Sequence, residues 1–353
     1  MKEEKPGHFR TAVTMWGLLA FFSFFQFFIQ ASGSLMGSAW QHAFRLNDFE
    51  LSILSSSFFY AYMIVQVFAG FLYDHWGARR VVHLAAIVFT AALFLFSWTH
   101  SFWLAVFARF LMGCGSGFAF VGMVYISALW FLPRQFILFV GLGEMLSMFL
   151  TSVGQGITSP LIQNFGWRVV LVGLGLFGVI YIILVNLFLK NPQNFKPKVQ
   201  PFLKTLWSHL KEVVKIKQVW LAGFFGAAAF GVITVFVSLW GSIFLQKAYG
   251  FTYINATDLV ALVPFGFAIG ASVFGFINQR YLSTTMLACI SGAVLLALYL
   301  GLLFFGHNLL INFGLYIGFG FFGGVSVLSY YIVERSVTAE LRGIALPLGF
   351  VMH

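Results

Sequence analysis

The chain has 353 residues, of which 60% are hydrophobic and only 8% are charged, and its formal net charge is +10. A water-soluble fold of this size could not bury so much apolar surface, which excludes ordinary soluble enzymes and binding modules. The apolar residues fall in long unbroken runs, whereas the strands of a β-barrel would show alternating segments of about 10 residues. The composition therefore predicts an all-α integral membrane protein that crosses the bilayer many times.

A bilayer core about 30 Å thick requires about 20 residues of helix for each crossing. Ten apolar runs meet this requirement, and an eleventh helix is expected to begin at Arg342 and to be cut off at His353. In chain order, the ten expected helices span residues 12–36, 49–73, 80–99, 102–131, 135–163, 167–189, 218–246, 257–278, 283–305 and 309–333.

The longest polar interval, residues 190–217, separates the first six expected helices from the others. Within it, apolar residues recur at helical spacing with lysines mainly between them, which predicts an amphipathic helix on the membrane surface. A helix that binds a partner protein is the alternative. The predicted organisation is thus a six-helix N-terminal lobe (1–189), a cytoplasmic linker (190–217) and an incomplete C-terminal lobe (218–353).

Most Lys and Arg residues outside the expected helices lie on the same side of the membrane as the N-terminus, which predicts a cytoplasmic N-terminus. This asymmetry and the anionic lipids of the inner leaflet account for the net charge, so we expect no nucleic-acid binding. We also expect no enzyme activity and no cofactor or metal, since the sequence shows no nucleophile triad, phosphate-binding loop or metal-ligand cluster.

The tight loop between the second and third expected helices reads Gly70-Phe-Leu-Tyr-Asp74-His-Trp-Gly77-Ala-Arg79-Arg80. This pattern resembles the signature of the major facilitator superfamily of membrane transporters, and it departs from the signature at His75, where the family usually has Arg or Lys. The resemblance implies the major facilitator fold, in which two six-helix lobes alternate access around a central cavity. In this chain the second lobe is expected to be truncated.

Asp74 is the expected conformational latch. A carboxylate at the cytoplasmic end of the second helix can face the positive N-terminal end of a helix in the other lobe, which favours the state closed toward the cytoplasm. The resemblance implies that this partner is the eleventh helix, near Arg342. Arg79 and Arg80 are expected to hold Asp74 in place or to bind lipid phosphate, and the alternative is that they only determine topology.

Internal repetition supports two related lobes. At an offset of 205 residues, Gly70-Phe71 matches Gly275-Phe276, and Gly113-x-Gly115 matches Gly318-x-Gly320. In the second copy of the loop, Gln279 stands where the repeat would have an aspartate. The first copy is therefore expected to carry the latch.

A second resemblance to the same family lies in the fourth expected helix, which contains Arg109-Phe-Leu-Met-Gly113-Cys-Gly115-Ser-Gly117. An Arg exposed to lipid at this depth would cost at least about 2.5 kcal/mol, so Arg109 is expected to face the interface between the lobes or a water-filled cavity. The resemblance implies a role in coupling or in lobe integrity, and direct contact with substrate is the alternative. Gly113, Gly115 and Gly117 are expected to allow close helix packing.

Glu144 is the other charged residue inside the hydrocarbon. Burial favours the neutral form of a carboxyl group, so Glu144 is a candidate proton carrier or else a neutral partner in a structural hydrogen bond. Neutral polar side chains at similar depth are further candidates for substrate contact, with a hydrogen bond between helices as the alternative for each. They are Gln26, Gln30, Tyr60, Tyr62 and Gln66 in the first lobe, and Thr234, Ser238, Ser326, Ser329, Tyr330 and Tyr331 in the second.

The same inventory limits the substrate. A dianionic organic phosphate would require cationic groups from both lobes, and the last four expected helices have no Lys or Arg at membrane depth. One buried Arg, one buried Glu and many amides and hydroxyls suit a zwitterion or a monocarboxylate better.

Two further segments, Leu54-Ser-Ser-Ser-Phe-Phe-Tyr-Ala-Tyr-Met63 and Phe118-Ala-Phe-Val-Gly122, resemble a bacterial nutrient-uptake branch of the family. That branch includes phagosomal amino-acid and nucleoside transporters, and it neighbours the lysosomal dipeptide transporters and the organic-anion symporters. The resemblance implies a secondary active transporter, expected to be a monomer in the bacterial inner membrane. With the polar inventory it predicts an amino acid, dipeptide or monocarboxylate as substrate, and buried Glu144 predicts coupling to protons. A uniporter, an organic-anion symporter and a transporter-like nutrient sensor are the alternatives.

Overall fold

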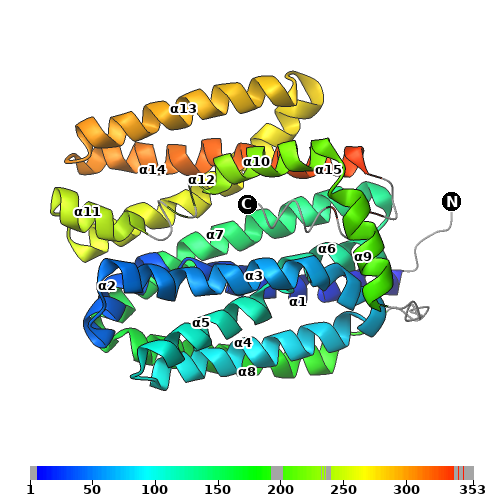
Figure 1. Cartoon of the computed structure of the whole chain (residues 1–353), viewed down its shortest axis with the longest axis horizontal. Helices are drawn as coiled ribbons and strands as arrows, with labels where there is room; N and C mark the ends of the chain where they lie inside the picture. Colours follow the sequence, from blue (N-terminus) through cyan, green and yellow to red (C-terminus); the bar gives the residue numbers. More distant parts are fainter. Residues whose placement is uncertain are drawn as a thin grey trace.

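The computed structural model describes residues 6–191, 202–231 and 240–337, together with residues 233, 235, 341 and 345. This part of the chain contains helices and no β-strand. Most of the helices run along one direction of the molecule, and α9 (Phe202–Val213) crosses them at the end where the first helix begins (Figure 1). We call this the N-terminal end of the bundle and the opposite end the distal end.

The helices follow one another with short connections. Before α9 they are α1 (Pro6–Gln30), α2 (Ser32–Phe44), α3 (Asp48–Trp76), α4 (Ala78–Trp98), α5 (Phe102–Ser116), α6 (Ala119–Trp130), α7 (Pro133–Phe165) and α8 (Trp167–Phe188). After α9 they are α10 (Lys217–Gly231), α11 (Ser242–Tyr249), α12 (Tyr253–Arg280), α13 (Thr284–Phe305), α14 (Leu309–Gly323), the 3-10 helix η2 (Gly324–Val327) and α15 (Leu328–Ser336).

Each of the ten predicted membrane helices corresponds to one or more of these elements, and eight stretches of the described residues are long and apolar enough to cross a membrane. Three predicted helices are interrupted within described residues, because 12–36 is formed by α1 and α2, 102–131 by α5 and α6, and 309–333 by α14, η2 and α15. A fourth, 218–246, falls on α10 and α11, and part of the segment between these two helices lies outside the described residues. The interruptions fall at Ala31, at Gly117–Phe118 and at Gly323–Gly324. Small residues occur at all three, and glycine in particular weakens a helix at such points.

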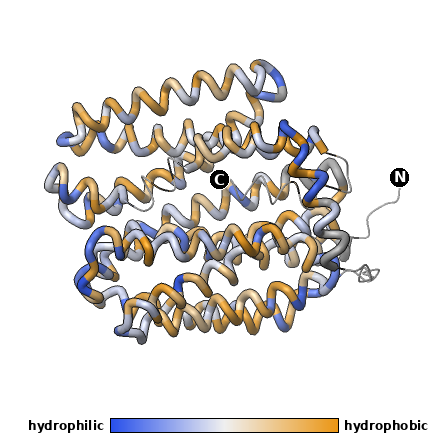
Figure 2. The backbone as a smooth tube through the Cα atoms, in the orientation of Figure 1, coloured by the Kyte–Doolittle hydropathy of each residue, from blue (hydrophilic) through white to orange (hydrophobic). Residues whose placement is uncertain are grey.

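The helices form two lobes. The first lobe (α1–α8) surrounds a large apolar core, in which α3 packs on α5 and α4 on α8. The second lobe (α10–α15) surrounds smaller cores, in which α12 packs on α14. The lobes meet chiefly where α7 runs along α12. Hydrophobic residues occupy the long middle part of the bundle, and hydrophilic residues gather at its two ends and in α9 (Figure 2), as expected for a bundle whose middle faces lipid.

Glycines set the closest helix contacts in both lobes, and these contacts bear on the register of the repeat. A methyl group at Gly113 would collide with the carbonyl oxygen of Phe58 in α3, and one at Gly320 would collide with that of Val263 in α12. Phe58 and Val263 are 205 residues apart, but Gly113 and Gly320 are 207 apart. These helix contacts pair Gly113 with Gly320, whereas the sequence offset pairs Gly113 with Gly318, because glycines at alternate positions align equally well after a shift of two.

Gly115 and Gly117 also lie where helices approach closely. A methyl group at Gly115 would collide with the backbone of α4 at Ala85, and one at Gly117 would press on Val65 of α3. These contacts are of the kind expected for small residues in membrane helix packing.

The predicted linker contains α9, whose Trp207 ring lies 5.6 Å from the ammonium of Lys211. Val213 at its end is buried in a small cluster with Val219 and Val333 of the second lobe, and Phe71 of α3 packs against the same cluster. The predicted start of an eleventh helix at Arg342 lies outside the described residues.

Candidate functional site

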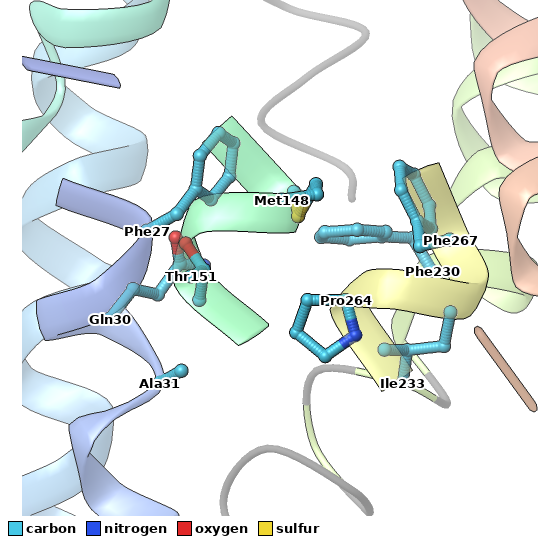
Figure 3. A pocket seen from close by; sticks show the side chains of 9 residues that line it. All are labelled: Phe27, Gln30, Ala31, Met148, Thr151, Phe230, Ile233, Pro264 and Phe267. Carbon is cyan, nitrogen blue, oxygen red and sulfur yellow. The ribbon is translucent and has the colours of Figure 1, made fainter. Parts of the chain in front are cut away.

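A small cavity lies between the lobes beside the seam of α7 and α12 (Figure 3). Its volume is about 40 Å³, which gives room for a few water molecules. Figure 3 shows Gln30 and Thr151 on the first-lobe side of the cavity, opposite Pro264 and Phe267 of the second lobe. The lining residues are Phe27, Gln30, Ala31, Met148, Thr151, Phe230, Ile233, Pro264 and Phe267.

Glu144 lies on α7, one turn before Met148 of the cavity wall. Its half-buried carboxyl group interacts electrostatically with the phenol groups of Tyr62 on α3 and Tyr330 on α15. Both lobes therefore contribute to the surroundings of this carboxyl. Next to it on α7, Gly143 is packed so closely against first-lobe side chains that an added methyl group would collide with Met123.

One face of α7 carries further polar groups that the sequence analysis missed. Met148, Thr151 and Gln155 follow Glu144 at helical spacing, so all four lie on the same side of the helix. Thr151 lines the cavity, and the buried side-chain oxygen of Gln155 has no hydrogen-bond partner among the described residues. The sequence contained this information, because residues that follow Glu144 at helical spacing must share its face of the helix.

The three predicted amides have different surroundings. Gln30 lines the cavity, whereas Gln26 and Gln66 are enclosed by other side chains. The amide groups of Gln26 and Gln66 have no hydrogen-bond partner in the described part of the chain. Unpaired buried amides are costly, which marks these positions as candidates for contacts with water or solute.

Tyr60 does not belong to this group. Its side chain is 62% exposed, whereas the half-buried side chain of Tyr62 interacts electrostatically with Glu144. Two residues along a helix correspond to a rotation of about 200°, so these two tyrosines point in nearly opposite directions. Neither tyrosine lines the cavity, so contact of Tyr60 or Tyr62 with substrate stays a prediction.

In the second lobe, Ser326 of η2 and Ser329 of α15 are buried close to Tyr330 in the chain. Tyr331 lies under the guanidinium of Arg335, whose central carbon is 4.3 Å from the ring centroid. The other two predicted positions, Thr234 and Ser238, lie outside the described residues. The described residues also contain no group of His, Cys, Asp and Glu that could hold a metal ion.

Arg109 occupies the interior of the first lobe, and only 1% of its surface is exposed. The guanidinium lies between the rings of Trp40 and Phe58, at 5.1 and 5.0 Å from their centroids, and donates to the carbonyl oxygen of Ile29 and the hydroxyl of Ser32. The expectation that Arg109 faces the interface or a water-filled cavity is corrected by these contacts. Hydropathy gives the depth of a residue in a helix but not the side toward which it points.

At the distal end, three pairs of residues join the lobes. The phenol of Tyr253 donates a 2.7 Å hydrogen bond to the carbonyl oxygen of Leu35. The hydroxyls of Ser159 and Thr257 are 2.5 Å apart, and Lys247 forms an exposed ion pair of 3.3 Å with Asp48. The distal end is thus closed by contacts of α2, α3 and α7 with α11 and α12.

The sequence matches the family model described as Major Facilitator Superfamily over residues 16–352. This chain belongs to the major facilitator superfamily. It is therefore a transporter by family, and the multi-pass helical architecture agrees with that assignment. Comparison with known proteins also agrees with the expectation that the chain is not an enzyme, because the matched proteins are transporters of this family.

Curated relatives are distant but cover most of the chain. Uncharacterized transporter YybO of Bacillus subtilis is 24% identical over 99% of this chain and 82% of that protein. Probable galactarate/D-glucarate transporter GudP of Escherichia coli is 23% identical over 95% of the chain and 83% of its own length. Probable sulfoacetate transporter SauU of Cupriavidus necator is 23% identical over 71% of the chain and 61% of its own length.

Solved structures share the fold. A bacterial homolog of the human lysosomal transporter Spinster, inward-facing and unoccupied, matches with a TM-score of 0.70 at 16% identity, over 99% of this chain and 80% of that one. A mutant of the nucleoside transporter NupG matches with a TM-score of 0.68 at 14% identity, over 97% and 87% of the two chains. At such identities the likeness concerns the major facilitator fold alone.

The signature loop of this major facilitator protein connects α3 and α4 at the N-terminal end. Gly77 has a φ of 77°, a conformation that favours glycine, and a side chain there would collide with Asn191. Arg79 donates to the backbone oxygen of Asn186 at 2.8 Å, so it binds the last turn of α8. Cations are favourable at a helix C-terminus, and this contact fixes the loop against α8.

Asp74 is half-buried in the last turn of α3 and forms a hydrogen bond with the side chain of Tyr125 on α6. The phenol oxygen of Tyr125 also lies 3.2 Å from the carbonyl oxygen of Tyr73, so its single proton is shared between the carboxylate and that carbonyl. The carboxylate is thus connected to α6 of its own lobe. Its predicted partner in the eleventh helix lies outside the described residues.

Proposed function

We propose that this protein is a proton-coupled secondary transporter of a small polar solute, and that Glu144 carries the coupling proton. The transporter class follows from the family, whereas the coupling and the solute are the proposal. The observation that supports it most is the position of Glu144 on α7, where Tyr62 of one lobe and Tyr330 of the other interact with its carboxyl.

A carboxyl in such a position can link proton binding to lobe movement. Burial favours the neutral carboxyl, whereas water or donors from the two lobes favour the charged form. When the lobes separate, the phenol of Tyr330 moves away from α7 and water reaches Glu144, so its proton affinity changes with the conformational state. A proton that binds the two states with different affinity shifts the equilibrium between them.

The substrate that suits this site best is a zwitterionic amino acid or a dipeptide. Arg80 and Arg168 lie at the ends of their predicted helices, and Arg109 is the one Lys or Arg deeper within the ten predicted helices. Trp40 and Phe58 enclose Arg109 within the first lobe. The described surroundings of the cavity therefore offer amides, hydroxyls, aromatic rings and one carboxylate. A carboxylate can bind the ammonium group of an amino acid, and the aromatic rings can add a cation–π interaction.

Transport of an organic anion is the second candidate. It is favoured by the names of relatives such as GudP and SauU, which are described as transporters of galactarate/D-glucarate and sulfoacetate. A dicarboxylate would have to bind beside Glu144 without a cationic partner from the described part of the cavity, which would leave a charge poorly compensated. For this reason we place the anion second.

A direct uptake experiment distinguishes the two candidate substrates. The purified protein is reconstituted in proteoliposomes and offered labelled alanine, the dipeptide Ala-Ala, lactate, galactarate and sulfoacetate, with and without an external acid pH. We expect uptake of the amino acid or the dipeptide that increases with the inward proton gradient. Uptake of galactarate or sulfoacetate without uptake of the amino acid or dipeptide would show that the anion assignment is correct.

We propose in addition that the N-terminal end faces the cytoplasm of a bacterial cell, with residues 1–189 and 218–353 as the two functional lobes. The arginine pair Arg79 and Arg80 lies at that end together with Lys211, Lys215 and Lys217, which supports this orientation. Asp74 remains the candidate latch at the same end.

A further inference from the structure

The first membrane helix is interrupted at Ala31, between α1 and α2. Across this interruption the amide of Ser34 bonds to the carbonyl oxygen of Ala31, a bond three residues back instead of four. The carbonyl oxygen of Ile29 accepts a 2.6 Å hydrogen bond from the hydroxyl of Ser32. Side-chain donors that insert into a helical hydrogen-bond ladder are a known cause of bends.

Arg109 reaches this interruption from α5. Its Nη1 atom is 3.3 Å from the carbonyl oxygen of Ile29 at the end of α1 and 3.1 Å from the hydroxyl oxygen of Ser32 at the start of α2. The ring of Trp40, two turns further along α2, covers the same guanidinium. One side chain therefore holds both sides of the interruption.

The remaining guanidinium nitrogens strengthen this interpretation. Nε and Nη2 of Arg109 have no hydrogen-bond partner among the described residues, although the side chain is buried. All hydrogen bonds from Arg109 to oxygen in the described part of the chain are thus made at the junction of α1 and α2. An arginine paired with a carboxylate would instead donate two parallel hydrogen bonds from two of its nitrogens to that one group.

The interruption also divides two functional surfaces. On the α1 side, Phe27 and Gln30 line the cavity between the lobes, and Ala31 itself lies at its edge. On the α2 side, the carbonyl oxygen of Leu35 accepts from Tyr253 of the second lobe, at the distal end. A rotation of α2 about Ala31 would break the distal contact while leaving the cavity wall of α1 in place.

We infer that the junction of α1 and α2 is a hinge for opening the distal end, and that Arg109 is the positioning residue that holds this hinge closed. The inference does not depend on which solute is transported. In this inference Arg109 fixes the position of α2, and the position of α2 controls access to the cavity from the distal end. Lysine could reach one oxygen at the junction, but its single ammonium cannot lie flat between two aromatic rings while it donates to both sides.

Distances between spin labels test this inference. Labels are placed on His42 of α2 and Ala248 of α11, both exposed at the distal end, in a background carrying Cys114→Ala and Cys289→Ser. A second pair, Asn164 of α7 and Ala248, reports movement of whole lobes. Pulsed electron paramagnetic resonance is then measured on the protein in lipid nanodiscs, without added solute.

In Arg109→Ala, the distance distribution of the first pair is expected to broaden and shift to longer distances, while that of the second pair stays unchanged. Arg109→Lys should correct the shift only in part. Ser32→Ala, which removes one hydrogen-bond partner of Arg109 at the junction, should shift the first pair in the same direction by a smaller amount and provides a test if Arg109→Ala does not fold. Gly173→Ala on α8 of the same lobe, where an added methyl group meets no atom within 4 Å, serves as the control.

Two results would overturn the inference. If the first pair keeps its distribution in both Arg109→Ala and Ser32→Ala, Arg109 does not hold the junction. If the two pairs lengthen together, the lobes move as rigid bodies and the junction is not a hinge.

Discussion

The phenol oxygen of Tyr253 donates a 2.7 Å hydrogen bond to the carbonyl oxygen of Leu35, and this bond joins the two lobes at the distal end. The two residues are far apart in the sequence and belong to α12 and α2. Tyr253 is therefore positioned to influence how often the distal end opens.

Tyr253→Phe should open the distal end more often. A net hydrogen bond contributes about 0.5–1.5 kcal/mol, so its loss should raise the open population by roughly 2- to 10-fold. Labelling of a cysteine at Thr151 in the cavity wall with a membrane-impermeant reagent measures this change. Tyr249→Phe is the matched control, because the phenol of Tyr249 bonds to Leu302 within the second lobe. Equal labelling rates in both variants would contradict a role for Tyr253 in closure.

Lys247→Ala should have little effect on the same measurement. Its ion pair with Asp48 is exposed on both sides, and exposed pairs are screened by water and salt. Labelling at Thr151 should thus remain close to that of the unmodified protein at physiological salt. A strong acceleration would show that the distal end is closed by this charge pair.

Gly113→Ala should destabilise the first lobe. The new methyl group would meet the carbonyl oxygen of Phe58 in α3, and overpacking of this kind costs about 1–3 kcal/mol. Gly173→Ala on α8 is the control, since no atom lies within 4 Å of a methyl group there and alanine favours helix. Thermal unfolding in detergent should give a lower melting temperature for the first variant and an unchanged or higher one for the second.

The sequence predicted the membrane helices well because a span is a local property of about 20 residues. It did not predict the interruption at Ala31, because such a break depends on side chains such as Arg109 that arrive from another helix. The expected direction of Arg109 was also wrong, since hydropathy fixes the depth of a residue but not its neighbours. Glu144 was found because a carboxyl in hydrocarbon is costly, whereas neutral Thr151 on the same face carried no such signal.

Asp74→Asn tests the proposed latch at the N-terminal end. If the charge of Asp74 stabilises closure there, the variant should insert normally, transport more slowly and allow faster labelling of cavity cysteines from that end. Tyr125→Phe removes a hydrogen-bond partner of Asp74 while keeping its charge, and it should have a smaller effect. If labelling and transport are unchanged in Asp74→Asn, Asp74 is not a latch.

Uphill transport by the Glu144→Gln variant tests the central claim most directly. Proteoliposomes containing the unmodified protein or Glu144→Gln are given the solute identified by uptake, and accumulation is measured against an imposed pH gradient together with exchange between preloaded pools. We predict that Glu144→Gln loses gradient-driven accumulation and keeps exchange, because glutamine preserves the shape of the side chain but cannot bind and release a proton. If Glu144→Gln still concentrates the solute in response to the gradient, Glu144 does not carry the coupling proton.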